Sequence, residues 1–149
     1  MTHLSERHFI ACPYGLARHF LQAELTSAGG VLEWTLHVAA SAPHETAKDV
    51  DVTVSPAADP RLDRPWNVAW TPKGDDPYPS FAGTLAFRAD ERPNVSALDL
   101  TGRYEPPMGA VGTAFDLLLG ARLATTTAEA LLRDLGDRII VRYTSKRAG

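Results

Sequence analysis

The sequence predicts an α+β fold in which a curved antiparallel sheet of about six strands packs against one long carboxy-terminal helix. Hydrophobic and polar residues alternate in several short runs between residues 31 and 104. This pattern is typical of antiparallel strands with one buried and one wet face. From residue 109 to about residue 135 the apolar spacing changes to three and four, which indicates an amphipathic helix. A sheet that ends in such a helix favours an architecture with a cavity between the two.

The first two elements are a strand and a helix. Residues 4–11 alternate modestly and predict a strand. Pro13 suits the first turn of a helix, where its missing N–H needs no partner. Apolar residues then recur at helical spacing, namely Leu16, Ala17, Phe20 and Leu21. The Ala-Gly-Gly at residues 28–30 ends this helix.

The strands that follow are recognised by their alternation and by the proline-, glycine- and aspartate-rich turns between them. Their apolar residues point to one face: Leu32, Trp34, Leu36, Val38, Val50, Val52, Val54, Trp66, Val68, Trp70, Phe81, Leu85, Phe87, Leu98, Leu100 and Tyr104. In this register His37 and Asp99 lie on the opposite, wet face, which argues against a buried acid–base pair. Tyr104 is the one inward-facing residue with a hydroxyl.

The final helix carries an apolar stripe made of Leu117, Ala121, Ala124, Ala128, Leu131 and Leu135. Its middle is alanine, so the helix either sits close on the sheet or leaves a space beneath it, and spacing alone leaves both open. Phe115 and Leu119 fall on the polar side. Either a kink at Gly120 resets the face there, which we favour, or the two residues form an exposed patch that favours a homodimer. Beyond Gly136 we expect the helix to continue rather than give way to a strand at 138–143.

Composition narrows the function. The 149 residues predict a single domain, 1–149, and the net charge of −3 gives no overall basic field for nucleic acid. The single cysteine, Cys12, fits a buried thiol in a reducing compartment. No apolar run approaches the ~20 residues that span a bilayer, so we expect a cytoplasmic protein without membrane insertion. The histidines lack ligand spacing and no phosphate loop is present, so we expect no metal, no cofactor and no catalytic residue.

One segment resembles a known family. The run Leu100-Thr-Gly-Arg-Tyr-Glu-Pro-Pro-Met-Gly and the helix after it, through about Leu135, resemble the START-like (SRPBCC) superfamily, which includes the polyketide cyclase/dehydrase and lipid-transport group. The resemblance implies a helix-grip fold whose cavity holds an apolar or amphipathic molecule. The chain departs from the family in one respect. Only residues 11–28 separate the first two strands, where relatives often fit two helices, and this shortens one wall of the expected cavity.

We therefore expect a non-enzymatic module that binds a small hydrophobic molecule, lipid- or polyketide-like, between sheet and helix. The expected lining residues are Trp34, Trp66, Trp70, Phe87, Leu100, Tyr104, Ala121, Ala124 and Ala128. One alternative is a polyketide cyclase or dehydratase that uses Tyr104 with Arg103 or Glu105. A second alternative is a cavity-free interaction protein that dimerises through Phe115 and Leu119.

Overall fold

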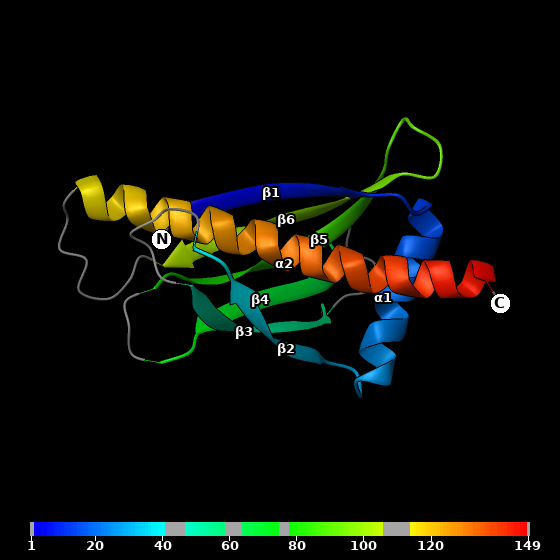
Figure 1. Cartoon of the computed structure of the whole chain (residues 1–149), viewed down its shortest axis with the longest axis horizontal. Coiled ribbons are helices and arrows are strands. Elements are labelled where there is room, and N and C mark those ends of the chain that lie inside the picture. The colour runs from blue at the N-terminus through cyan, green and yellow to red at the C-terminus, as the bar shows by residue number, and fades with distance from the viewer. Residues whose placement is uncertain (1, 41–46, 59–63, 75–77, 106–113, 149) are drawn as a thin grey trace.

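The computed structural model describes residues 2–40, 47–58, 64–74, 78–105 and 114–148. Six strands form one antiparallel sheet in the order β1-β6-β5-β4-β3-β2, so that β1 and β2 are its edges (Figure 1). The strands are β1 (Thr2–Ile10), β2 (Leu32–Val38), β3 (Lys48–Pro56), β4 (Trp66–Pro72), β5 (Ser80–Ala89) and β6 (Ser96–Glu105). The predicted α+β fold class is confirmed.

Two helices lie on the same face of the sheet. The long α2 (Ala114–Ala148) runs across the sheet, and α1 (Tyr14–Ser27) lies against its carboxy-terminal part (Figure 1). An ion pair ties the two helices together, because Arg142 Nε donates to Glu24 Oε1 at 2.5 Å. The expected helix at 138–143 is confirmed, and the alternative of a last strand is wrong.

The single helix between β1 and β2 ends where two glycines permit it. Gly30 N–H donates to the Leu25 carbonyl at 2.7 Å, and Gly29 N–H donates to that of Thr26 at 3.1 Å. Gly29 and Gly30 have φ of 88° and 105°, a region that side chains disfavour. This pair of bonds satisfies the last carbonyls of α1 and turns the chain into β2.

The alternation predicted for the strands is confirmed by burial. The face toward α2 (the inner face) holds the core of the molecule, while the outer face is wet. Of the expected lining residues, those buried in the core are Trp66, Trp70, Phe87, Leu100, Tyr104, Ala124 and Ala128. Trp34 and Ala121 share this face but are half-buried and pack at the margin of the core.

The junction at residues 106–113 and the side chain of Phe115 lie outside the described part of the chain. The helix passes Gly120 without interruption, and Leu119 is half-buried. The neighbouring Leu118 is the more exposed, at 72%. A homodimer through Phe115 and Leu119 therefore stays a prediction.

Two further observations concern the described residues. None of their helices is long and apolar enough to span a membrane. No group of three or more of their histidine, cysteine, aspartate and glutamate side chains is arranged to hold a metal ion.

Candidate functional site

The inner face of the sheet carries an aromatic wall on β4 and β5. Trp70 and Phe81 are cross-strand partners whose rings stack with centroids 4.5 Å apart and planes within 16°. Trp66 and Phe87 lie further along the same two strands, with centroids 5.2 Å apart at 55°. The indole N–H of Trp70 donates to the Pro79 carbonyl at 2.9 Å, so this ring is fixed in place. The wall is consequently apolar and rigid.

A pair of glycines shapes the end of this wall. Gly83 on β5 lies opposite Gly102 on β6, and a Cβ on either would come within 2.6 or 2.7 Å of the Phe81 ring. The ring therefore lies over bare backbone. Only glycine leaves the space that lets Phe81 lie flat against Trp70.

The helix faces this wall with small residues. Ala124 and Ala128 are fully buried, and Thr127 between them is buried as well. Thr127 Oγ1 donates to the Leu123 carbonyl at 2.7 Å. Tyr78 Oη lies 2.5 Å from Thr127 Oγ1. Tyr104 is therefore not alone as an inward-facing hydroxyl. Tyr78 could not be predicted from alternation because it stands in a proline-rich segment, outside any alternating run.

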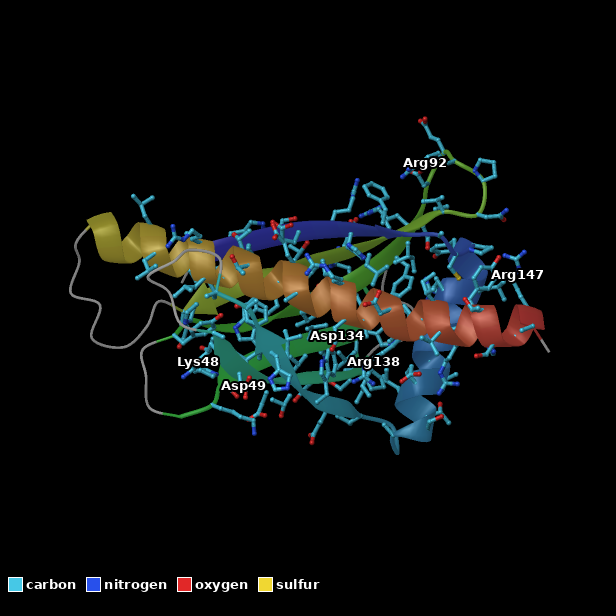
Figure 2. All side chains as sticks on the ribbon, in the orientation of Figure 1. Lys48, Asp49, Arg92, Asp134, Arg138 and Arg147 are labelled. Carbon is cyan, nitrogen blue, oxygen red and sulfur yellow. The ribbon has the colours of Figure 1, made fainter. Side chains whose placement is uncertain are left out.

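Two buried donors lie where β2 meets α2. The guanidinium carbon of Arg138 is 4.9 Å from the centre of the Trp34 ring, a cation–π contact. The side chain of Arg138 extends from α2 on the side of Asp134 (Figure 2). Trp34 Nε1 and Arg138 Nε are both buried, and neither has an acceptor among the described residues. Buried donors are nearly always paired, so these two mark a place that suits a hydrogen-bond acceptor.

The same part of the molecule has an open hollow of about 240 Å³. It lies between the free edge of the sheet and α2, and is lined by Thr35, Leu36, His37, Ala130, Arg133, Asp134 and Asp137. Thr35 and Leu36 directly follow Trp34 in β2. Neither Trp34 nor Arg138 is among the described residues that line the hollow, but their chain neighbours Thr35 and Asp137 are.

Two ionisable side chains lie on the opposite side of α2, on the inner face of β1. Burial, with the negative charge of Glu129, raises the pKa of Glu6. Burial lowers the pKa of His8. The positive charge of Arg133 lowers this pKa further, while the negative charge of Asp137 acts to raise it. Neither residue stands out in the sequence, because polar side chains at inward positions weaken the alternation of the first strand.

The remaining predictions about polar residues concern the outer face and the cysteine. His37 and Asp99 lie on the outer face, as expected, and His37 Nδ1 is 2.5 Å from Asp49 Oδ1. Cys12 is buried, and burial raises the pKa of its thiol. A thiol in this state is a poor nucleophile.

No protein-family model matches the chain, and no curated protein matches its sequence significantly. Solved structures do match. A Thermus thermophilus protein shares 17% identity over 95% of this chain and 99% of its own, with a TM-score of 0.52. The Zhui aromatase/cyclase of a Streptomyces species shares 13% identity over 95% of each chain, with a TM-score of 0.55.

The chain has the START-like, helix-grip fold. A START superfamily protein from Mycobacterium smegmatis also matches, at 12% identity over 92% of this chain and 96% of its own, with a TM-score of 0.48. At such identities the likeness concerns the START-like fold alone. The single helix between β1 and β2 and the donors at Trp34 and Arg138 belong to the structure of this chain itself.

Proposed function

We propose that the chain binds a small hydrophobic molecule, lipid- or polyketide-like, between the inner face of the sheet and α2. The observation that carries the proposal is the buried Nε1 of Trp34, which has no acceptor among the described residues and stands at the margin of the core. Ligand sites are mostly apolar with a few placed polar groups. The lining residues are Trp34, Trp66, Trp70, Phe87, Leu100, Tyr104, Ala121, Ala124 and Ala128.

The polar end of the site selects the ligand's chemistry. Trp34 Nε1 and Arg138 Nε can only donate hydrogen bonds, so the ligand presents an acceptor oxygen to them, such as a carbonyl, phenol or carboxylate. Leaving a buried donor unpaired costs about 1–3 kcal/mol, and the bound oxygen removes this cost. The apolar body of the ligand lies against Trp66, Trp70 and Phe87, and it enters through the hollow between β2 and α2.

A cyclase-type enzyme is the second candidate, favoured by the inward-facing Glu6 and His8. Proton transfer needs groups that titrate near the working pH. Indole does not titrate there, and a guanidinium stays charged, so Trp34 and Arg138 orient a ligand rather than exchange protons with it. Glu6 and His8 lie on β1, at the other edge of the sheet. Binding without catalysis is therefore the better supported function.

The test uses a fluorescent fatty acid and a fluorescent polyphenol. Ala124→Trp places an indole between α2 and the wall, and we expect binding of both probes to be lost. Ala82→Trp is the matched control, because it adds the same side chain to the exposed outer face of β5. Binding that is undiminished in a folded Ala124→Trp, or lost equally in Ala82→Trp, contradicts the proposal.

A second variant guards against unfolding of the first. Trp34→Phe keeps an aromatic ring but removes the indole N–H, together with part of the ring system. We expect it to weaken binding of a probe with an acceptor oxygen by about tenfold, the effect of one hydrogen bond of about 1.4 kcal/mol. Unchanged affinity in this variant removes Trp34 from the site.

A further inference from the structure

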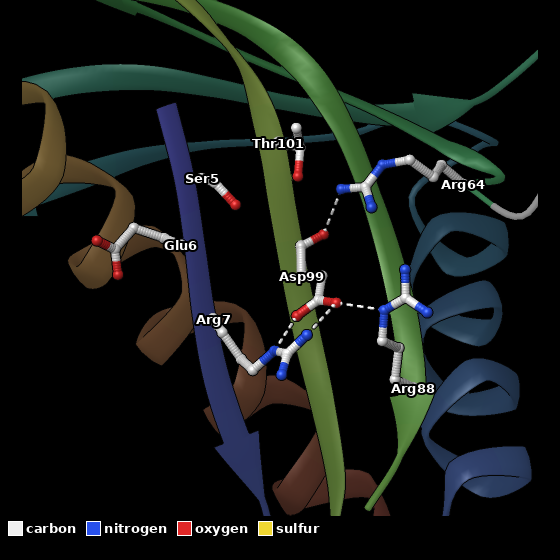
Figure 3. Close-up of a pocket in the computed structure, with 7 residues that line it drawn as sticks. All are labelled: Ser5, Glu6, Arg7, Arg64, Arg88, Asp99 and Thr101. Carbon is white, nitrogen blue, oxygen red and sulfur yellow. Dashed lines mark hydrogen bonds and ion pairs between the residues drawn. The ribbon is translucent and has the colours of Figure 1, made fainter. Parts of the chain in front are cut away.

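A cluster of three arginines surrounds Asp99 on the outer face of the sheet, away from α2 (Figure 3). Arg7 comes from β1, Arg88 comes from β5, and Arg64 comes from the segment just before β4. Asp99 lies on β6 between them and is 7% exposed, although it stands on the wet face. The arginines therefore cover this carboxylate.

Asp99 holds two of the arginines by its side chain. Arg7 donates from Nε to Oδ1 at 2.5 Å and from Nη2 to Oδ2 at 3.0 Å, while Arg88 Nε donates to Oδ2 at 2.6 Å. Arg64 bonds only to uncharged acceptors. Its Nη2 reaches the carbonyls of Thr84 and Asp99, both at 2.8 Å, and its Nε reaches Thr84 Oγ1 at 2.6 Å. All three guanidinium groups are thereby fixed in position.

The cluster carries more positive than negative charge. Asp99 is the one carboxylate bonded to these three guanidinium groups in the described chain, Asp90 acts on Arg7 only by its charge, and Arg64 has no carboxylate partner among the described residues. Glu6 also lines the hollow, but its carboxyl group points away from the arginines (Figure 3). Burial lowers the pKa of Arg64. The negative charge of Asp99 acts to raise this pKa, and the positive charge of Arg88 lowers it. A second negative charge would stabilise this arrangement.

The arginines have N–H donors left to bind such a negative group. The Nη1 atoms of Arg7 and Arg64 and both Nη atoms of Arg88 have no acceptor within the described chain. The hydroxyl-bearing Ser5 and Thr101 line the same open hollow, which has a volume of about 580 Å³. These donors exceed what the two oxygens of a carboxylate can accept, whereas the terminal oxygens of a phosphate can engage several guanidinium groups at once.

We propose that this outer-face hollow binds the phosphate group of a small molecule, through Arg7, Arg64 and Arg88. Asp99 takes part as a positioning residue, because it holds Arg7 and Arg88 in place. The volume exceeds that of phosphate alone, so a phosphate monoester fits better than the free ion. The site is separated from the inner face by the sheet itself and does not depend on the function proposed there.

The test is a titration of the intact chain, followed by ³¹P NMR, with inorganic phosphate and with ribose 5-phosphate at constant ionic strength. We expect saturable binding of both, with the ester at least as tight. Arg88→Gln should weaken it by about tenfold or more, the loss expected for hydrogen bonds to a charged group. The matched control is Arg103→Gln, which removes the same charge from the same face, four residues from Asp99 on β6. It should stay within about twofold, because screening limits distant surface charges.

Several outcomes overturn the proposal. The wild-type chain alone is decisive, since the absence of saturable phosphate binding contradicts it whatever the variants do. An equal loss in Arg103→Gln and Arg88→Gln shows a diffuse charge effect rather than a site. If acetate competes with phosphate equally well, the site binds carboxylates rather than phosphates. If ribose binds as tightly as ribose 5-phosphate, the phosphate group is not what the site recognises.

Discussion

The hydroxyl of Tyr78 lies 2.5 Å from Oγ1 of Thr127, and this hydrogen bond joins the segment before β5 to the middle of α2. Thr127 gives its own proton to the Leu123 carbonyl, so Tyr78 is the donor to Thr127. Both side chains are buried. The bond fixes the helix over the sheet at the alanines that face the aromatic wall.

This bond predicts a measurable coupling. Tyr78→Phe and Thr127→Val should each destabilise the fold by about 1–2 kcal/mol, because a buried hydrogen bond is lost. The double variant should lose less than the sum of the two, with a coupling energy of about 1 kcal/mol. Urea unfolding of the four proteins measures it. Strict additivity would mean that the two groups do not interact in solution.

Asp99 predicts a loss of stability in acid. Burial acts to raise its pKa, but the hydrogen bonds and charges of Arg7 and Arg88 outweigh this and hold the pKa below its ordinary value. Asp99 therefore stabilises the fold fully above about pH 4, the unfolded value, and this contribution disappears as the pH falls through the folded pKa. Asp99→Asn should cost about 1–3 kcal/mol at pH 7. Urea unfolding at several pH values checks that the difference from wild type shrinks toward pH 2. A difference that grows in acid would contradict the sign.

The pKa of His8 should depend on two charged residues of α2. Burial lowers its pKa below the ordinary ~6.5, so the neutral form is favoured in the folded chain. Stability should then fall as the pH drops below about 6.5, since the unfolded chain takes up the proton first. In ¹H NMR titrations, Arg133→Gln should raise the pKa of His8 and Asp137→Asn should lower it further. Shifts in the reverse directions would place His8 away from these two charges.

Alanine substitutions at Gly102 and at Gly15 should have opposite effects on stability. A Cβ at Gly102 would lie 2.5 Å from the Gly83 Cα and overlap the Ala82 carbonyl, both of them backbone that cannot move aside. Gly102→Ala should therefore destabilise the fold by about 1–3 kcal/mol, as overpacking does. Gly15 lies in α1, and a Cβ there would meet no atom within 4 Å. Gly15→Ala should therefore stabilise the fold by about 0.5–1 kcal/mol. Thermal unfolding separates the two, and equal effects would refute the close approach of β5 and β6.

The strands could be predicted because the sheet is wet on one face, so its inward residues stand out by alternation. Edge strands obey this rule less well. On β1 the inward-facing Glu6 and His8 are half-buried, and on β2 the inward-facing Trp34 is half-buried as well. Polar groups are tolerated there because these side chains remain partly open to water.

The outer-face cluster could not be predicted from local spacing. Arg7 and Asp99 are cross-strand partners although they are 92 positions apart in the chain, and Arg64 reaches the Asp99 carbonyl from 35 positions away. Such pairs are defined only once the strand order and register are known. The order places β1 beside β6, which no feature of either strand alone indicates.

The proposed function depends most directly on a hydrogen bond from Trp34 to a ligand bound between the sheet and α2. The chain has three tryptophans, so a ¹⁵N–¹H spectrum shows three indole signals, and Trp34→Phe identifies one of them. Titration with the fluorescent polyphenol should shift the Trp34 signal saturably and more than that of Trp70, whose N–H is already held by Pro79. A Trp34 signal that stays in place while the probe saturates the protein, or the absence of any binding, would contradict the account.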